Sequence, residues 1–452
     1  MAARHKVEVT VDPARDAEFD RAFGLLRDLV DWSAADSPVP GAWECGLHHQ
    51  CGVVDTGVAA DESRAFVGVC GEAADRHAAR LPAAEQTDHR GKVVEGAAQW
   101  LAERVRDSLI EDAAPSFDGR RVYLVDGTTI TLAPVPALRR AFPPASNQHG
   151  VGVWPVALLV VAHELSSGAA LIPSVGAMYG EQAVSETALA RDLFTQMPGD
   201  AIVMADAGFG IFAVAWDARQ TQRDFVFRLT DSRFTALRRK ATVVASGQNG
   251  TTCSHTWCPS AKERQTHPDL PLDAALEVRL HEIRIHDTLT LFLVTSLPHT
   301  AEEHSELYRH RGDVETDLRN LKVVLNTENV LNTENIEAKS VEMFHKELLT
   351  SLVAYNLVTQ FRRQAAKLIH EPPRRMSFKN IWTTFNIFLW SSHARDSAGW
   401  RAQYRQALLI ATQDKLPNRP GRSFEREAYA RRPKSNQFKK RKPKTTEPKT
   451  DS

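Results

Sequence analysis

Residues 121–132, RVYLVDGTTITL, are the stretch that indicates the fold. The apolar run VYLV precedes Asp126 and Gly127, and a second β-prone run, TTITL, follows them. Asp-Gly is a favoured two-residue turn between antiparallel strands, so the pattern predicts two short strands joined at Asp126–Gly127.

The segments that follow continue the alternation of strands and helices. Residues 154–178 predict two further strands that turn at Ser-Ser-Gly, and residues 185–197 form an amphipathic helical pattern that ends before Pro198. Residues 200–210, DAIVMADAGFG, predict a buried strand with a Gly-rich turn, followed by another helix and the strand 224–229. Antiparallel strands followed by helix, strand, helix and strand are the layout of an RNase H-like α/β core.

The flanking regions differ from this core in pattern. Residues 230–295 read as a β-rich insertion, and the helical segment that follows opens with Thr300 and Glu303 in capping-box spacing. Amphipathic patterns also predict helices over 19–32, 92–110 and 341–411. The tandem repeat LNTENV-LNTENI, residues 325–336, is expected to be a loop because of its Asn and Thr content.

Four regions follow from these patterns. We expect a mainly helical N-terminal region over 1–115, and an RNase H-like core over 116–345 with its insertion at about 230–295. A helical region should cover 346–430, and a basic, disordered tail 431–452.

Composition is that of an ordinary globular protein, with 42% hydrophobic and 25% charged residues among 452. The charged start of the chain resembles no signal peptide, and the longest apolar run, 151–162, is too short to span a bilayer and contains Pro155. The chain is therefore expected in the cytoplasm. Its five cysteines lack the paired CxxC spacing of structural zinc sites, so neither Cys45–Cys51 nor Cys253–Cys258 predicts bound zinc.

A net charge of zero hides an asymmetry along the chain. Residues 361–452 hold 22 Lys and Arg against 7 Asp and Glu, whereas the first 360 residues hold 34 against 49. A basic tail is a solvated segment in many proteins and a sequence-independent contact to nucleic-acid phosphates in others, and both interpretations stay open on charge alone.

Two aspartates come at the ends of apolar strand patterns. Asp126 follows VYLV and Asp206 follows IVMA, and each alone has a structural explanation as a turn or helix-cap residue. On neighbouring strands of an RNase H-like sheet, however, the two would point the same way, and Glu315 on a packed helix could complete a three-carboxylate cluster. Carboxylates gathered in this way suit Mg²⁺ or Mn²⁺, and two such ions stabilise the attacking and leaving oxygens of a phosphoryl displacement.

The segment YRHRGDVETDLRNLK, residues 308–322, carries a polar stripe. Tyr308, Arg311, Glu315 and Lys322 stand at offsets of 0, 3, 7 and 14, which on one continuous helix would lie within about 60° of each other. Such a stripe is either a solvated face or a surface that meets a charged ligand. If Glu315 binds metal ions, Arg311 and Lys322 could neutralise DNA phosphates, and Tyr308 could stack on a base or bond a phosphate.

The same residues resemble a known enzyme family. The spacing Tyr308-x2-Arg311-x3-Glu315-x6-Lys322 is similar to the signature of DDE transposases of the insertion sequence 4 family, and VDGTT and MADAGFG resemble its two aspartate motifs. The likeness covers roughly residues 118–435 and includes the β-rich insertion, KELLTSLVAYNLV, RRMSFKNIW and the basic tail.

The resemblance implies cut-and-paste transposition by a homodimer bound to transposon terminal inverted repeats and then to target DNA, in a prokaryotic nucleoid. Water would be activated by two Mg²⁺ ions, for which Mn²⁺ can substitute, held by Asp126, Asp206 and Glu315. The residues matching Tyr308, Arg311 and Lys322 hold DNA near the cut in such enzymes.

Two other functions remain open. One is a catalytically decayed or repurposed DNA-binding copy, against which the retention of three carboxylates argues, since such a cluster is costly to a protein that only binds. The other is an RNase H-like nuclease without strand transfer, against which the polar stripe and the insertion argue.

Overall fold

The computed structural model describes residues 90–148, 150–247, 250–287, 289–324, 336, 338–391 and 397–417. The chain divides into two units, Met1–Lys415 and Leu416–Ser452, and every element described below belongs to the first. Four sequence features fall wholly or almost wholly outside the described residues: the helical pattern at 19–32, the cysteines at 45–51, the repeat at 325–336 and the basic tail at 431–452.

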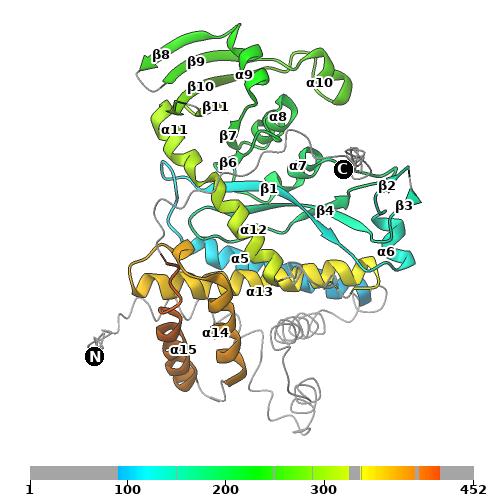
Figure 1. Ribbon diagram of the computed structural model, residues 1–452, viewed down its shortest axis with the longest axis vertical. Coiled ribbons are helices and arrows are strands. Elements are labelled where there is room, and N and C mark those ends of the chain that lie inside the picture. Colours follow the sequence, from blue (N-terminus) through cyan, green and yellow to red (C-terminus); the bar gives the residue numbers. More distant parts are fainter. Residues whose placement is uncertain are drawn as a thin grey trace, which may run out of the picture. The chain divides into compact units, whose positions relative to one another are not determined.

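A mixed sheet with helices packed on it forms the centre of the fold, as Figure 1 shows. Five strands lie in the order β5-β4-β1-β6-β7, in which β5, β4 and β1 are antiparallel and β1, β6 and β7 are parallel. Their bounds are β1 Val122–Thr131, β4 Val156–Glu164, β5 Ser174–Ala177, β6 Ile202–Ala205 and β7 Asp224–Arg228. Helix α7 (Glu186–Thr195) connects β5 to β6, and α8 (Phe212–Gln220) connects β6 to β7. This is the RNase H-like order predicted from the sequence.

One prediction about this sheet is wrong. The segment around Asp126–Gly127 is a single strand, β1, and not a hairpin of two short strands. Nine consecutive residues, Tyr123 to Thr131, pair with β4, so the ladder continues through the Asp-Gly dipeptide. Tertiary strand pairing overrides the local turn preference here, as it commonly does for short β signals.

The sheet continues beyond β7 into four strands of the β-rich segment. They follow in the order β11-β10-β9-β8, and β11 pairs antiparallel with β7. Their bounds are β8 Thr242–Gly247, β9 Gly250–Trp257, β10 Leu276–His286 and β11 Leu289–Thr295; helix α9 (Asp231–Arg238) precedes β8, and α10 (Ala261–Thr266) lies between β9 and β10. Because β11 extends the central sheet, the chain re-enters the core directly before the helices that carry Glu315.

Two hydrophobic cores lie on the two faces of the sheet because side chains alternate along each strand. Val122 and Leu124 of β1 belong to the core shared with the helices α5 (Arg90–Glu111), α12 (Asp313–Val324) and α13 (Val341–Leu368). Tyr123 and Val125 belong to the core shared with α7 and α8. The amphipathic pattern at 92–110 is confirmed as part of α5, which packs against α13. The result is a sheet between two helical layers.

The helical segment after β11 is interrupted. Helix α11 (Ala301–Tyr308) begins at the predicted capping box of Thr300 and Glu303, and the 3₁₀ turn η2 (Arg309–Gly312) separates it from α12 (Asp313–Val324). The four residues of the polar stripe therefore do not lie on one continuous α-helix, because the tighter 3₁₀ turn changes the rotation between Tyr308 and Glu315.

The remaining elements are mostly helical. The predicted helical region contains α13 Val341–Leu368, η3 Pro373–Arg375, α14 Phe378–Ser391 and α15 Ser397–Ala411, while α6 Pro136–Ala141, β2 Ser146–Asn147 and β3 Gly150–Val151 lie between β1 and β4. None of the helices within the described residues combines the length and the apolar character needed to cross a bilayer.

Candidate active site

Asp126 and Asp206 occupy matching positions on neighbouring strands. The parallel pairing of β1 and β6 runs from Val122↔Ile202 to Val125↔Ala205. Asp126 directly follows Val125, and Asp206 directly follows Ala205. Because the carboxyl ends of parallel strands meet at one edge, both carboxylates lie at the same place along the sheet. Strand β1 continues past this point, so Asp126 lies within a strand while Asp206 begins the loop after β6.

Each aspartate is oriented by a bond from nearby backbone. Asp126 Oδ1 accepts a hydrogen bond from the Gly127 amide at 2.9 Å, and Asp206 Oδ1 accepts one from the Gly208 amide at 2.8 Å. Burial raises the pKa of the Asp126 carboxyl, and the nearby Arg311 guanidinium opposes that shift. In both residues the other carboxylate oxygen, Oδ2, faces the guanidinium of Arg311.

Arg311 joins the two aspartates to Glu315. Its Nη2 lies 3.0 Å from Asp126 Oδ2 and 3.6 Å from Asp206 Oδ2, and its Nη1 donates to Glu315 Oε1 at 2.9 Å. The Arg311 side chain is only 16% exposed, whereas those of Asp206 and Glu315 are 42% and 55% exposed. Three carboxylates from β1, the β6 loop and α12 thus converge on one guanidinium at the surface of the sheet.

The chemistry of these donors fits a hard divalent cation. Their ligand atoms are all carboxylate oxygens, which Mg²⁺ and Mn²⁺ prefer, and they already surround a cationic group. Within the described residues, no three His, Cys, Asp or Glu side chains stand close enough around one point to hold a metal ion as they are arranged. The carboxylates therefore fit the ions in type and in convergence, and binding would require Arg311 to withdraw from between them.

A comparison with protein families agrees with this geometry. The family described as Transposase DDE domain matches residues 118–357, which is more than half of the chain. The chain belongs to the transposase DDE domain family. No curated protein matches the sequence. The matched residues include β1, the β6 loop and α12, so this transposase domain contains all three carboxylates.

A tyrosine that stacks on a DNA base would need an exposed ring, but Tyr308 is buried in this transposase. It is the last residue of α11, its side chain is buried, and its hydroxyl donates to the Ala205 carbonyl at 3.4 Å. Burial raises the pKa of this hydroxyl well above its ordinary value. Tyr308 therefore packs beneath the strand end that carries Asp206 and does not present its ring to solvent.

Lys322 shares a helix with Glu315. It stands in the last turn of α12, seven residues after Glu315 and partly exposed. Seven residues span about 10 Å and two turns, so both side chains leave the same side of the helix. This pair, unlike Tyr308, keeps the relationship predicted from the sequence.

A fourth carboxylate at the site was not identified from the sequence. Glu186 begins α7, and a Cβ added to Gly127 would collide with its Oε1, so the glutamate lies directly over β1 beside Asp126. Burial and the charges of Asp126 and Asp206 raise the pKa of Glu186. No spacing signal links residues 126 and 186, although Ser185-Glu186 does read as the start of a helix.

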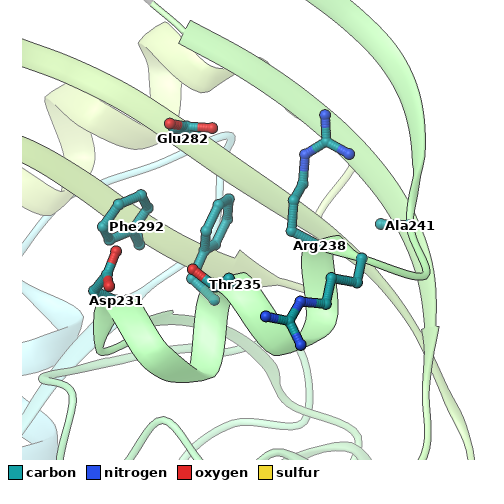
Figure 2. Close-up of a pocket in the computed structure, with 8 residues that line it drawn as sticks. Asp231, Thr235, Arg238, Ala241, Glu282 and Phe292 are labelled. Carbon is teal, nitrogen blue, oxygen red and sulfur yellow. The ribbon is translucent and has the colours of Figure 1, made fainter.

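Arg233 on α9 borders the loop after Asp206. Its Nη1 donates to the Ala207 carbonyl at 2.6 Å and lies 3.3 Å from the Gly210 carbonyl. Farther along α9, a cavity of about 440 Å³ opens between this helix and strands β10 and β11. Figure 2 shows Arg238, Asp231 and Glu282 among its lining residues, so both signs of charge face the cavity.

Proposed function

We propose that the protein is a cut-and-paste DNA transposase of the insertion sequence 4 family. The observation that supports this most is the convergence of Asp126, Asp206 and Glu315, which are far apart in sequence, on the single guanidinium of Arg311. Repulsion makes such a cluster costly unless cations neutralise it, and phosphoryl transfer is a reaction that uses it.

Each residue has a proposed role. Asp126, Asp206 and Glu315 would hold two Mg²⁺ ions, or Mn²⁺ in their place, which when bound supply charge stabilisation for the attacking and leaving oxygens of an in-line displacement. Arg311 of η2 and Lys322 of α12 would contact DNA phosphates. For Tyr308 we propose that it supports the Asp206 loop through Ala205, since its ring is buried.

Arg311 has to serve two partners in this scheme. Its guanidinium bridges the carboxylates, and a DNA phosphate offers the same planar pair of acceptors. We propose that Arg311 exchanges carboxylates for phosphate when DNA is bound, which would open the space between the three acids.

The rest of the chain would support the same reaction. We propose that residues 1–115 bind the transposon ends, that 116–345 form the catalytic core with its insertion, that 346–430 contribute to a homodimer on DNA, and that 431–452 add sequence-independent phosphate contacts. The substrates would be terminal inverted repeats and target DNA in a prokaryotic nucleoid.

Excision from a plasmid that carries the gene's own flanking ends tests the proposal. With Mg²⁺ present, the parent chain should release the element, and Glu315→Gln should reduce excision by at least a thousandfold through loss of a carboxylate ligand. Glu302→Gln is the matched control, because Glu302 is an exposed glutamate in the first turn of α11 that should be dispensable.

The outcomes separate the alternatives. Excision by the parent and by Glu302→Gln, but not by Glu315→Gln, supports a transposase that uses Glu315. End cleavage without joining to target DNA would favour a nuclease. Binding to the ends with no cleavage by any variant would show a DNA-binding copy and refute the enzyme.

A further inference from the structure

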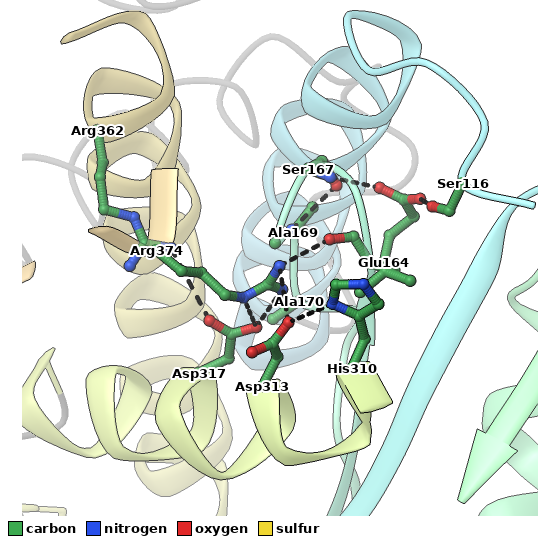
Figure 3. A network of polar contacts seen from close by, with 12 residues as sticks. Ser116, Glu164, Ser167, Ala169, Ala170, His310, Asp313, Asp317, Arg362 and Arg374 are labelled. Carbon is green, nitrogen blue, oxygen red and sulfur yellow. Dashed lines mark hydrogen bonds and ion pairs between the residues drawn. The ribbon is translucent and has the colours of Figure 1, made fainter. Parts of the chain in front are cut away.

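The face of α12 opposite Glu315 is also charged. Asp313 and Asp317 stand two residues before and after Glu315, which places each roughly 160° around the helix from it. Figure 3 shows both aspartates directed at Arg374, a residue of η3 almost sixty positions farther along the chain. The helix that carries Glu315 is therefore tied down by ionic contacts on its far side.

Arg374 contacts three separate points. Its Nη2 and Nε donate to Asp317 Oδ2 at 2.6 and 3.3 Å, and its Nη1 lies 3.7 Å from Asp313 Oδ2. The same Nη1 donates to the Leu165 carbonyl at 2.9 Å, in the turn that follows β4. One side chain thus links α12 to the end of a central strand.

The contacts around Arg374 are deeply buried. Asp317 has no exposed surface, and Arg362 of α13, only 2% exposed, places its Nη2 3.8 Å from Asp317 Oδ1. The turn after β4 is in turn held by α13, where the Tyr355 hydroxyl donates to the Gly168 carbonyl and Asn356 exchanges hydrogen bonds with Ala170. Helix α12, the turn and α13 form one bonded unit.

Stability alone does not account for this arrangement. Removing charges from water is costly, and well-packed apolar side chains in place of a buried ion network commonly leave a protein equally or more stable. Hydrogen bonds from a planar guanidinium are directional, whereas apolar contacts are not. The bonds from Arg374 to α12 therefore form at only one rotation of the helix about its axis. That rotation decides where Glu315 points.

On these contacts, we propose that Arg374 and Asp317 are positioning residues that fix the rotation of α12 so that Glu315 faces Asp126 and Asp206. The inference rests on the proposed function, since it concerns the orientation of a carboxylate assigned there. Arg362 supports Asp317 from the other side, and neither arginine touches the reacting groups.

Mn²⁺ binding, followed by electron paramagnetic resonance, tests the proposal separately from excision activity. Arg374→Gln and Asp317→Asn should weaken Mn²⁺ binding about tenfold or more, as loss of groups that orient metal ligands generally does. Arg374→Lys keeps the positive charge but loses the planar guanidinium with its fixed donors. The Mn²⁺ affinity of Arg374→Lys should therefore lie between that of Arg374→Gln and that of the parent.

Arg120→Gln is a closely matched control. Arg120 is 21% exposed, as Arg374 is, pairs with Asp224 at 2.7 Å and donates to one backbone carbonyl, but it lies at the amino ends of the strands. Replacing Arg120 should leave the Mn²⁺ affinity within about twofold of that of the parent. It should lower the melting temperature by about as much as Arg374→Gln does.

A triple variant separates orientation from folding. Arg362→Met, Asp317→Leu and Arg374→Met together remove the three most buried charges and leave only the partly exposed Asp313 of the network, so the chain should melt no lower than the parent yet bind Mn²⁺ weakly. Parent-like Mn²⁺ affinity in this variant, or in Arg374→Gln, would overturn the positioning role. If the triple variant does not fold, the order of affinities of parent, Arg374→Lys and Arg374→Gln decides.

Glu315→Gln distinguishes failure of the proposed metal site from failure of the positioning role alone. If it leaves Mn²⁺ binding unchanged, the proposed metal site fails and this inference fails with it. If it weakens binding while Arg374→Gln does not, only the positioning role is refuted.

Discussion

At the scale of single residues, Arg311 organises the site more than its spacing in the sequence suggested. Its place three residues after Tyr308 and four before Glu315 indicated contact with DNA. In the structure its guanidinium lies between three carboxylates, of which two, on β1 and in the loop after β6, lie more than a hundred residues upstream. Periodicity along a helix identifies which residues share a face, but it does not report what that face meets.

Replacement of Arg311 should make the protein more dependent on divalent cations. In Arg311→Gln the three carboxylates lose their shared cation and repel each other, so both the melting temperature and the free energy of unfolding in EDTA should fall. The loss of free energy should be only about 1 kcal/mol, because two of the acids are half exposed and water screens their charges. Added Mg²⁺ should then raise the melting temperature of this variant more than that of the parent.

Arg311→Lys is the control for the preceding prediction, because it keeps one positive charge among the acids. Thermal denaturation with and without Mg²⁺ measures the difference. An equal Mg²⁺ effect on the parent and on Arg311→Gln would show that the guanidinium does not neutralise the cluster.

At the scale of elements, most helices and strands follow from local pattern, and the exceptions have physical causes. The capping box at Thr300 and the helix from Ser185 are found where the spacing places them. The hairpin predicted at Asp126–Gly127 is absent because β4 pairs through it, and η2 interrupts the polar stripe. Strand pairing depends on residues about thirty positions away, which a local pattern does not contain.

Some residues of the site, like some elements of the fold, could be predicted from local sequence, and others could not. Asp126, Asp206 and Glu315 were predicted together because strand ends and motif spacing are visible in sequence. Glu186 and Arg233 were missed because they reach the site only through the placement of α7 and α9 against the sheet. Proximity that arises from packing between elements has no signature along the chain.

The capping box gives a prediction at this scale. Thr300 accepts from the Glu303 amide and Glu303 accepts from the Thr300 amide at 2.8 Å, which satisfies free donors at the start of α11. Thr300→Ala should lower the free energy of unfolding by about 1 kcal/mol, measured by urea denaturation. Thr266→Ala, at the exposed end of α10, should cost less than half as much, and an equal loss would contradict the role of the cap.

At the scale of the whole molecule, titratable groups are buried in the interior. His163 on β4, His281 on β10 and His304 on α11 are all fully buried. Burial lowers the pKa of His163 and His304 to about 4 and that of His281 to about 3. These three residues lie on different elements of one extended sheet and its covering helix, so their protonation affects the molecule as a unit.

Stability should therefore fall as the pH drops below the ordinary histidine pKa of about 6.5. Below that pH the unfolded chain binds protons that the folded chain excludes. Each histidine should therefore lower the free energy of unfolding by about 1 kcal/mol between pH 6.5 and 5.5, and this loss should level off near the folded-state pKa values.

His163 offers the clearest test, because neither ring nitrogen has a hydrogen-bond partner within the described residues, and His163→Leu therefore leaves no donor without an acceptor. Urea denaturation at pH 7.5 and 5.5 should show a pH-dependent loss smaller by about 1 kcal/mol in His163→Leu, while the exposed His286→Leu keeps the parental loss. An unchanged loss in His163→Leu would mean that the buried imidazole takes up its proton without unfolding.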